Sequence, residues 1–159
     1  MKLAEALTAR ADLQRRIEQL RARITANARY QEGEEPAEDA SALIDEAETA
    51  LTQLRELIRR INLTNSRLDL GADGTMTDAL AARDVLRLRH SLLTDAAAAA
   101  SGSGGVFRQM RSELRQVAAL PVAQLRARAD AAALELRELD NRIQQANWTS
   151  ELEEQSGSR

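Results

Sequence analysis

The chain has 159 residues, the size of one ordinary globular domain, and 30% of them are charged. Its net charge is only −3, and this mixed composition is typical of soluble globular or coiled-coil proteins rather than disordered ones. The absence of cysteine and the single histidine, His90, exclude disulfides and multi-histidine metal sites within one chain. Because no long apolar run and no secretory signal pattern occur, we expect a cytoplasmic protein without a transmembrane segment.

The first predicted element is a long helix over residues 3–29. Leu13, Ile17, Leu20 and Ile24 recur every three or four residues and therefore lie on one face of a helix. At ~1.5 Å per residue this helix is about 40 Å long. It needs an equally long neighbour to bury that face.

Residues 31–39 interrupt the helical pattern with Gly33 and Pro36 and carry five acidic residues. Calcium binding is one interpretation, since hard cations prefer carboxylates, but the spacing does not match the twelve-residue calcium loop. The simpler interpretation is a charged connection whose acids favour the start of the next helix, which Asp39 or Ser41 can cap. We expect no metal ion and no cofactor.

The strongest pattern in the chain is an apolar stripe over residues 43–68. Its central seam consists of Leu43, Ala47, Ala50, Leu54, Leu57, Ile61, Thr64 and Leu68. A flanking set, Ile44, Leu51 and Ile58, widens the stripe to three positions per heptad. A stripe of this width is too broad for one partner helix, so we predict a second long helix that packs against two or more neighbours.

A glycine-containing turn over residues 70–74 separates this helix from a third one. Thr75 and Asp78 have the spacing of a capping box, which predicts the start of a helix that continues to about residue 100. Two neighbouring apolar rows follow this helix, the first made by Val85, Leu88 and Leu92, the second by Leu86, Leu93 and Ala100.

The remainder of the chain is predicted to end in a fourth helix. Residues 101–105 form a glycine–serine break, and residues 106–120 are compatible with either a helical segment or a short β-like one. The fourth helix begins at Val122, and Thr149 is expected to cap a last helical turn that holds Leu152. Residues 155–159 are expected to form a disordered tail.

These patterns predict an all-α fold: an elongated bundle of three to four long, coiled-coil-like antiparallel helices in a single domain over residues 1–154. The chain also resembles the small bacterial proteins labelled septicolysin. The resemblance is carried by segments 1–7, 10–14, 31–36, 77–80, 83–86 and 147–149, with Ile61, Asn62, Thr64 and Asn65. It implies a mostly helical, single-domain family of unknown function, and it departs from the more polar, β-like pattern of those relatives within residues 101–120. The label implies a cytolysin, which no residue in the chain supports.

Three classes of function are compatible with the sequence. The first is a structural or interaction protein that forms a homo-oligomer, because the apolar stripes are too broad for one chain to cover. Tyr30, Phe107 and Trp148 lie at the ends of segments and are the aromatic residues predicted for such an interface. Nucleic acid is not an expected partner, since aromatic residues that could stack on bases are few.

The second class is an enzyme or ligand-binding protein. No stretch has the pattern of a catalytic site, but a polar ligand site is possible if the turn folds the third helix back on the second. Its residues would be Asn62, Asn65, Arg83, Asp84 and His90. The third class is a membrane-active protein, for which the first helix is locally basic but has no aromatic residue on its apolar face.

Overall fold

The computed structural model of the chain describes residues 1–102 and 116–154, and these residues are helical without a sheet, as predicted. The long helices are α1 (Leu3–Asn27), α2 (Ala40–Arg67), α3 (Met76–Ala100) and α4 (Val122–Thr149). A single 3-10 turn, η1 (Gly71–Asp73), lies between α2 and α3. None of the helices in the described ranges is long and apolar enough to cross a membrane.

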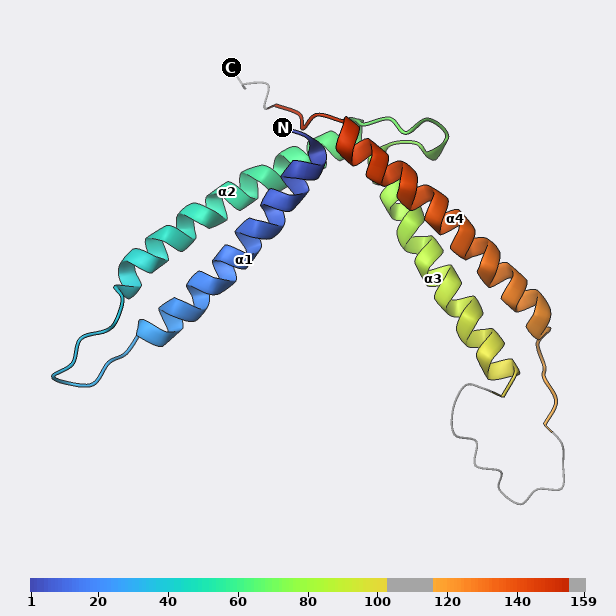
Figure 1. The fold of residues 1–159 in the computed structure, drawn as a ribbon, viewed down its shortest axis with the longest axis horizontal. Helices are drawn as coiled ribbons and strands as arrows, with labels where there is room; N and C mark the ends of the chain where they lie inside the picture. Colours follow the sequence, from blue (N-terminus) through green and yellow to red (C-terminus); the bar gives the residue numbers. More distant parts are fainter. Residues whose placement is uncertain (103–115, 155–159) are drawn as a thin grey trace. The chain divides into compact units, whose positions relative to one another are not determined.

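The chain packs as two compact units, each built on a pair of antiparallel helices. The first unit contains Met1–Asp69 and Gln145–Arg159, and the second contains Leu70–Gln144. Figure 1 shows α1 beside α2 in the first unit and α3 beside α4 in the second. The single domain over residues 1–154 stays a prediction. The β-like segment lies outside the described residues except for 116–120, which form no strand, and the predicted tail lies outside them entirely.

The core of the first unit is the seam predicted between the first two helices. Leu20 of α1 and Ala50 and Ile61 of α2 are almost inaccessible to solvent, with exposed fractions of 1%, 2% and 1%. α1 ends at Asn27, two residues earlier than predicted. The Asn27 side chain accepts a hydrogen bond from the Glu38 backbone N–H at 3.0 Å, which holds the returning chain against the end of α1.

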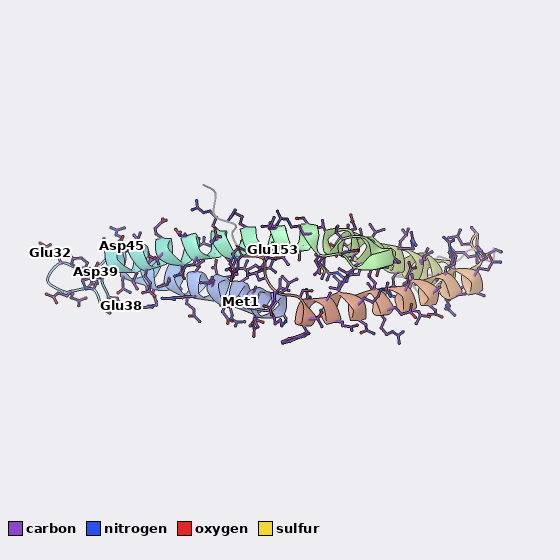
Figure 2. All side chains as sticks on the ribbon, turned by 90° about the horizontal axis from the view of Figure 1, so that it is seen from above. Met1, Glu32, Glu38, Asp39, Asp45 and Glu153 are labelled. Carbon is purple, nitrogen blue, oxygen red and sulfur yellow. The ribbon has the colours of Figure 1, made fainter. Side chains whose placement is uncertain are left out.

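The connection between α1 and α2 is the charged link that the sequence predicts, and Asp39 at its end caps the start of α2. The Asp39 carboxylate accepts hydrogen bonds from the backbone N–H groups of Ser41 at 2.9 Å and Ala42 at 3.3 Å. Glu38 pairs with Arg23, and these hydrogen bonds lower the pKa of the Glu38 carboxyl below its usual value. Figure 2 shows both acids at this connection. No cluster of three metal-ligating side chains occurs in residues 1–102 and 116–154.

The end of α4 differs from the prediction of a final helical turn. The helix stops at Thr149, and Leu152 is buried in an extended segment instead. The Leu3 N–H donates to the Ser150 carbonyl at 3.0 Å, and the Leu152 N–H donates to the Met1 carbonyl at 2.9 Å. These backbone bonds to the start of α1 replace the bonds that another helical turn would have made, which is why the prediction was wrong.

Thr64 anchors this extended segment to α2. It is 3% exposed, its hydroxyl donates to the Arg60 carbonyl at 2.9 Å, and the same oxygen accepts from the Glu153 N–H at 2.9 Å. Arg60 and Arg67 both contact Glu153, the first at its carbonyl and the second at its carboxylate. Figure 2 labels Met1 and Glu153 at the end of the first unit opposite to the charged connection. The polar residue in the α2 seam is therefore paired rather than free to bind a ligand.

The core of the second unit is the row of Leu86 and Leu93 on α3, packed against α4. Leu93 and Ala97 form one buried cluster with Leu125 and Ala129 of α4. At the other end of this pair, Arg142 of α4 donates to Asp73 of η1 at 3.0 Å. The start of α3 is thereby tied to the last turns of α4 within this unit.

Thr75 and Asp78 form the predicted capping box at the start of α3. The Thr75 hydroxyl accepts from the Asp78 N–H at 3.3 Å, and the Asp78 carboxylate accepts from the Thr75 N–H at 2.9 Å. The Thr75 hydroxyl also donates to Asp78 Oδ2 at 2.7 Å, and this bond, followed by the one from the Thr75 N–H, lowers the pKa of Asp78 below its usual value. Gly74 precedes the box with φ +75°, a left-handed conformation that side chains disfavour.

Substituting Gly74 by alanine is expected to destabilise the protein by roughly 2–3 kcal/mol, since it adds backbone strain and disturbs the cap. A Cβ there would lie 2.8 Å from Asp78 Oδ2 and 3.2 Å from Asp78 Cβ. Gly71→Ala is the matched control: its φ is also positive, at +65°, but no atom lies within 4 Å of the added Cβ. Urea unfolding should show a clearly smaller loss for Gly71→Ala, and equal losses would contradict the proposed clash.

Candidate functional site

On α3, the first of the two predicted apolar rows is open to solvent. Val85, Leu88 and Leu92 have exposed fractions of 54%, 72% and 69%, whereas Leu86 and Leu93 of the adjacent row are only 4% and 6% exposed. Residues three and four apart stand above one another on a helix, so the three exposed side chains form a continuous apolar surface. We call these three residues the α3 row.

On α2, the flanking apolar set is also incompletely covered. Ile44 and Leu51 are 47% and 44% exposed and Ile58 is half-buried, while Leu43 and Ala50 in the central seam are 5% and 2% exposed. α1 therefore covers the seam but not its flank, as the width of the stripe predicts. We call Ile44, Leu51 and Ile58 the α2 row.

The predicted polar ligand residues are divided between the two units. Asn62 is exposed and Asn65 half-buried on α2 in the first unit. Arg83, Asp84 and His90 lie on α3 in the second unit. A joint ligand site that uses all five residues stays a prediction.

Arg83 and Asp84 belong to a charge network that joins α3 to α4. Arg83 Nε lies 3.4 Å from Asp84 Oδ1 and 3.9 Å from Asp140 Oδ1 of α4. Arg87 completes the network, 3.6 Å from both Asp84 and Asp140. The sequence analysis did not identify Asp140, although an arginine close to a buried apolar row is often paired with a carboxylate of a neighbouring helix. Each pair is partly exposed and contributes little alone, so the network orients the two helices more than it stabilises them.

His90 lies half-buried at a shallow groove of about 440 Å³ between α3 and α4. Thr94 of α3 and Arg126 and Asp130 of α4 also line this groove, above an alanine floor. The polar groups, which include the Thr94 hydroxyl, lie at the edges of this shallow groove rather than around an enclosed cavity. The α2 and α3 rows are therefore the more developed candidate sites.

The predicted interface aromatics are exposed where the structure describes them. Tyr30 is 65% exposed just beyond α1, and Trp148 is 64% exposed in the last turn of α4. Both belong to the first unit, and Phe107 lies outside the described residues. Exposed aromatic side chains suit an interface, and their role in one stays a prediction.

Comparison with known proteins places the chain among relatives of unknown function. It is similar to a crystal structure described as a functionally unknown conserved protein from Corynebacterium diphtheriae, with 39% sequence identity and a TM-score of 0.88. The similarity covers 96% of this chain and 99% of that one. No curated protein matches the chain.

A family model provides the second line of comparison, and it matches residues 10–152. The prediction of a family of unknown function is thus confirmed, while neither comparison carries the septicolysin label. With nearly the whole length matched, the chain belongs to the family of unknown function DUF6847.

Proposed function

We propose that the chain is a structural or interaction protein whose helical units assemble with further copies of the chain. The observation that carries this proposal is the exposed α3 row, which lies beside a fully formed core and is not needed to build it. Single exposed apolar side chains are common on any protein, but a continuous row of large ones usually marks an interaction site. The α2 row gives the first unit a similar, less exposed surface.

The energetics of the α3 row suit reversible association. Fully burying a Val or Leu side chain contributes about 1.5–3 kcal/mol, and the three residues are more than half exposed. Covering the row on two copies therefore contributes roughly 6–12 kcal/mol, against an association cost of roughly 4–15 kcal/mol. Micromolar association needs about 8 kcal/mol net, which the upper end of this contribution leaves after the lower end of the cost, so we expect assembly no tighter than micromolar.

The proposal keeps the expectations of a cytoplasmic location and of no nucleic-acid partner. The septicolysin resemblance would instead imply membrane lysis, for which α1 is the candidate helix. Its apolar residues are leucine, isoleucine and alanine, without the aromatic anchors typical of helices that bind membrane surfaces. Self-assembly is therefore the better supported function.

Sedimentation equilibrium tests this proposal directly. Between about 1 and 100 µM, the mass is expected to rise from that of the 17.5 kDa chain to at least twice that value, because the association is reversible. A mass of one chain across the whole range would exclude self-assembly. A far-UV circular dichroism spectrum of the same samples would establish that the helices are formed.

A further inference from the structure

We infer that α3 pairs in parallel with α3 of a second copy of the chain, through the α3 row. This inference rests on the proposed self-assembly and adds its contact surface, its orientation and its polar contacts. It is carried by the heptad positions of the row and by the two charged residues at its edges.

The α3 row has the spacing and side chains of a short parallel coiled coil. Val85, Leu88 and Leu92 step by three and four, which are the a, d and a positions of a heptad. Val85 at a and Leu88 at d match the pattern that favours two strands in parallel coiled coils, whereas the second a position holds Leu92. Ala81 occupies the preceding d position, and Asp95 at the following d position ends the apolar row.

The charges at the edges of the row fit parallel pairing with an identical helix. Asp84 takes the g position before Val85, and Arg89 takes the e position after Leu88. In a parallel pair, each g residue faces the partner's e residue five positions later, so Asp84 of each copy faces Arg89 of the other. An antiparallel pair would bring the two Asp84 edges together and the two Arg89 edges together, so Asp84 would not face Arg89 of the other copy. The row is therefore complementary to itself in the parallel orientation.

Both edge residues have groups available for this contact. The Asp84 side chain is 64% exposed, and Arg83 donates its hydrogen bonds to Oδ1 of this carboxylate. Arg89 is exposed and forms no ion pair in the described residues, although it lines a second shallow groove together with Glu135 of α4.

The packing of the second unit leaves room for a second α3. α4 contacts the side of α3 that carries Leu86 and Leu93. The α3 row lies about 100–160° further round the helix, so a partner helix could approach it without displacing α4. In such a dimer, the α3 helix of each copy would cover the α3 row of the other copy.

Disulfide trapping of Ala81→Cys tests the orientation, because the chain has no native cysteine. In a parallel pair the two introduced thiols face each other within reach of a disulfide, whereas an antiparallel pair separates them by roughly 20 Å. Mild oxidation is expected to give mostly cross-linked dimer. Thr94→Cys is the control: Thr94 is exposed on α3 but lies at the groove beside His90, away from the row.

The edge charges provide the second arm of this experiment. Arg89→Glu should reduce the yield of the Ala81→Cys dimer by about tenfold, and adding Asp84→Arg should restore it by reversing the pair. An assembled wild-type protein without Ala81→Cys cross-linking, or with equal cross-linking of Thr94→Cys, would overturn the parallel α3 contact and leave self-assembly standing. If Arg89→Glu leaves the yield of the cross-linked Ala81→Cys dimer unchanged, the contact between Asp84 and Arg89 is excluded. A monomeric wild type would overturn both proposals.

Discussion

Leu88→Glu is expected to convert the assembled protein to a monomer, weakening association by at least about 100-fold. Leu88 lies at the centre of the α3 row and is its most exposed member, at 72%. A carboxylate at this position is well hydrated in the free chain and must lose that hydration in an apolar contact. Because the side chain contributes little to the core of its own chain, the free energy of unfolding should change by less than about 0.5 kcal/mol.

Sedimentation equilibrium of Leu88→Glu, compared with Thr94→Glu, measures this effect. The control introduces the same charge at an exposed position of the same helix, outside the row. It should leave association unchanged. If Leu88→Glu assembles as well as the control, the α3 row is not the contact, and a loss of assembly in Leu51→Glu would then assign it to the α2 row.

Ile61→Ala is expected to lower the free energy of unfolding by about 2–5 kcal/mol. Ile61 is 1% exposed in the α2 seam, so the shorter side chain loses buried apolar contacts and leaves a cavity. Ile44→Ala on the same helix makes the same chemical change at a position that is 47% exposed. It should lower the free energy of unfolding by about 1 kcal/mol or less, since little of its surface is buried in one chain.

Urea unfolding below the concentration at which the chain assembles separates the two positions. At low concentration the α2 row is not covered by another copy, so the comparison reports the packing of one chain alone. Similar losses for both variants would show that the seam and its flank are equally buried, which would remove the argument for an open α2 row.

The helices and their starts were predictable because the interactions that specify them are local. Asp39 caps α2 through backbone groups two and three residues away, and Thr75 and Asp78 cap α3 through each other. The three-and-four spacing of apolar residues is likewise a property of a single helix. The excess width of the apolar stripes was also predictable, since it follows from the number of apolar positions per heptad in the sequence.

The contacts that depend on distant segments could not be predicted in the same way. Leu152 lies in an extended segment because its N–H bonds to the Met1 carbonyl, and Arg83 is joined by Asp140 from another helix. Neither partner is specified by the residues around Leu152 or Arg83. The candidate site shares this limit: Arg83 and Asp84 were predicted as ligand-site residues, a role that stays a prediction, and the contact of Arg83 with Asp140 of α4 was missed.

The amino-acid sequence by itself determined the all-α class, the long helices, the caps of α2 and α3 and the presence of more apolar surface than one partner helix covers. Only the tertiary structure decided that α4 buries the row with Leu86 and leaves the row with Leu88 exposed. The two rows are adjacent and equally apolar, so hydrophobicity alone does not rank them. The choice depends on the direction from which α4 approaches, which is set by contacts between residues far apart in the chain.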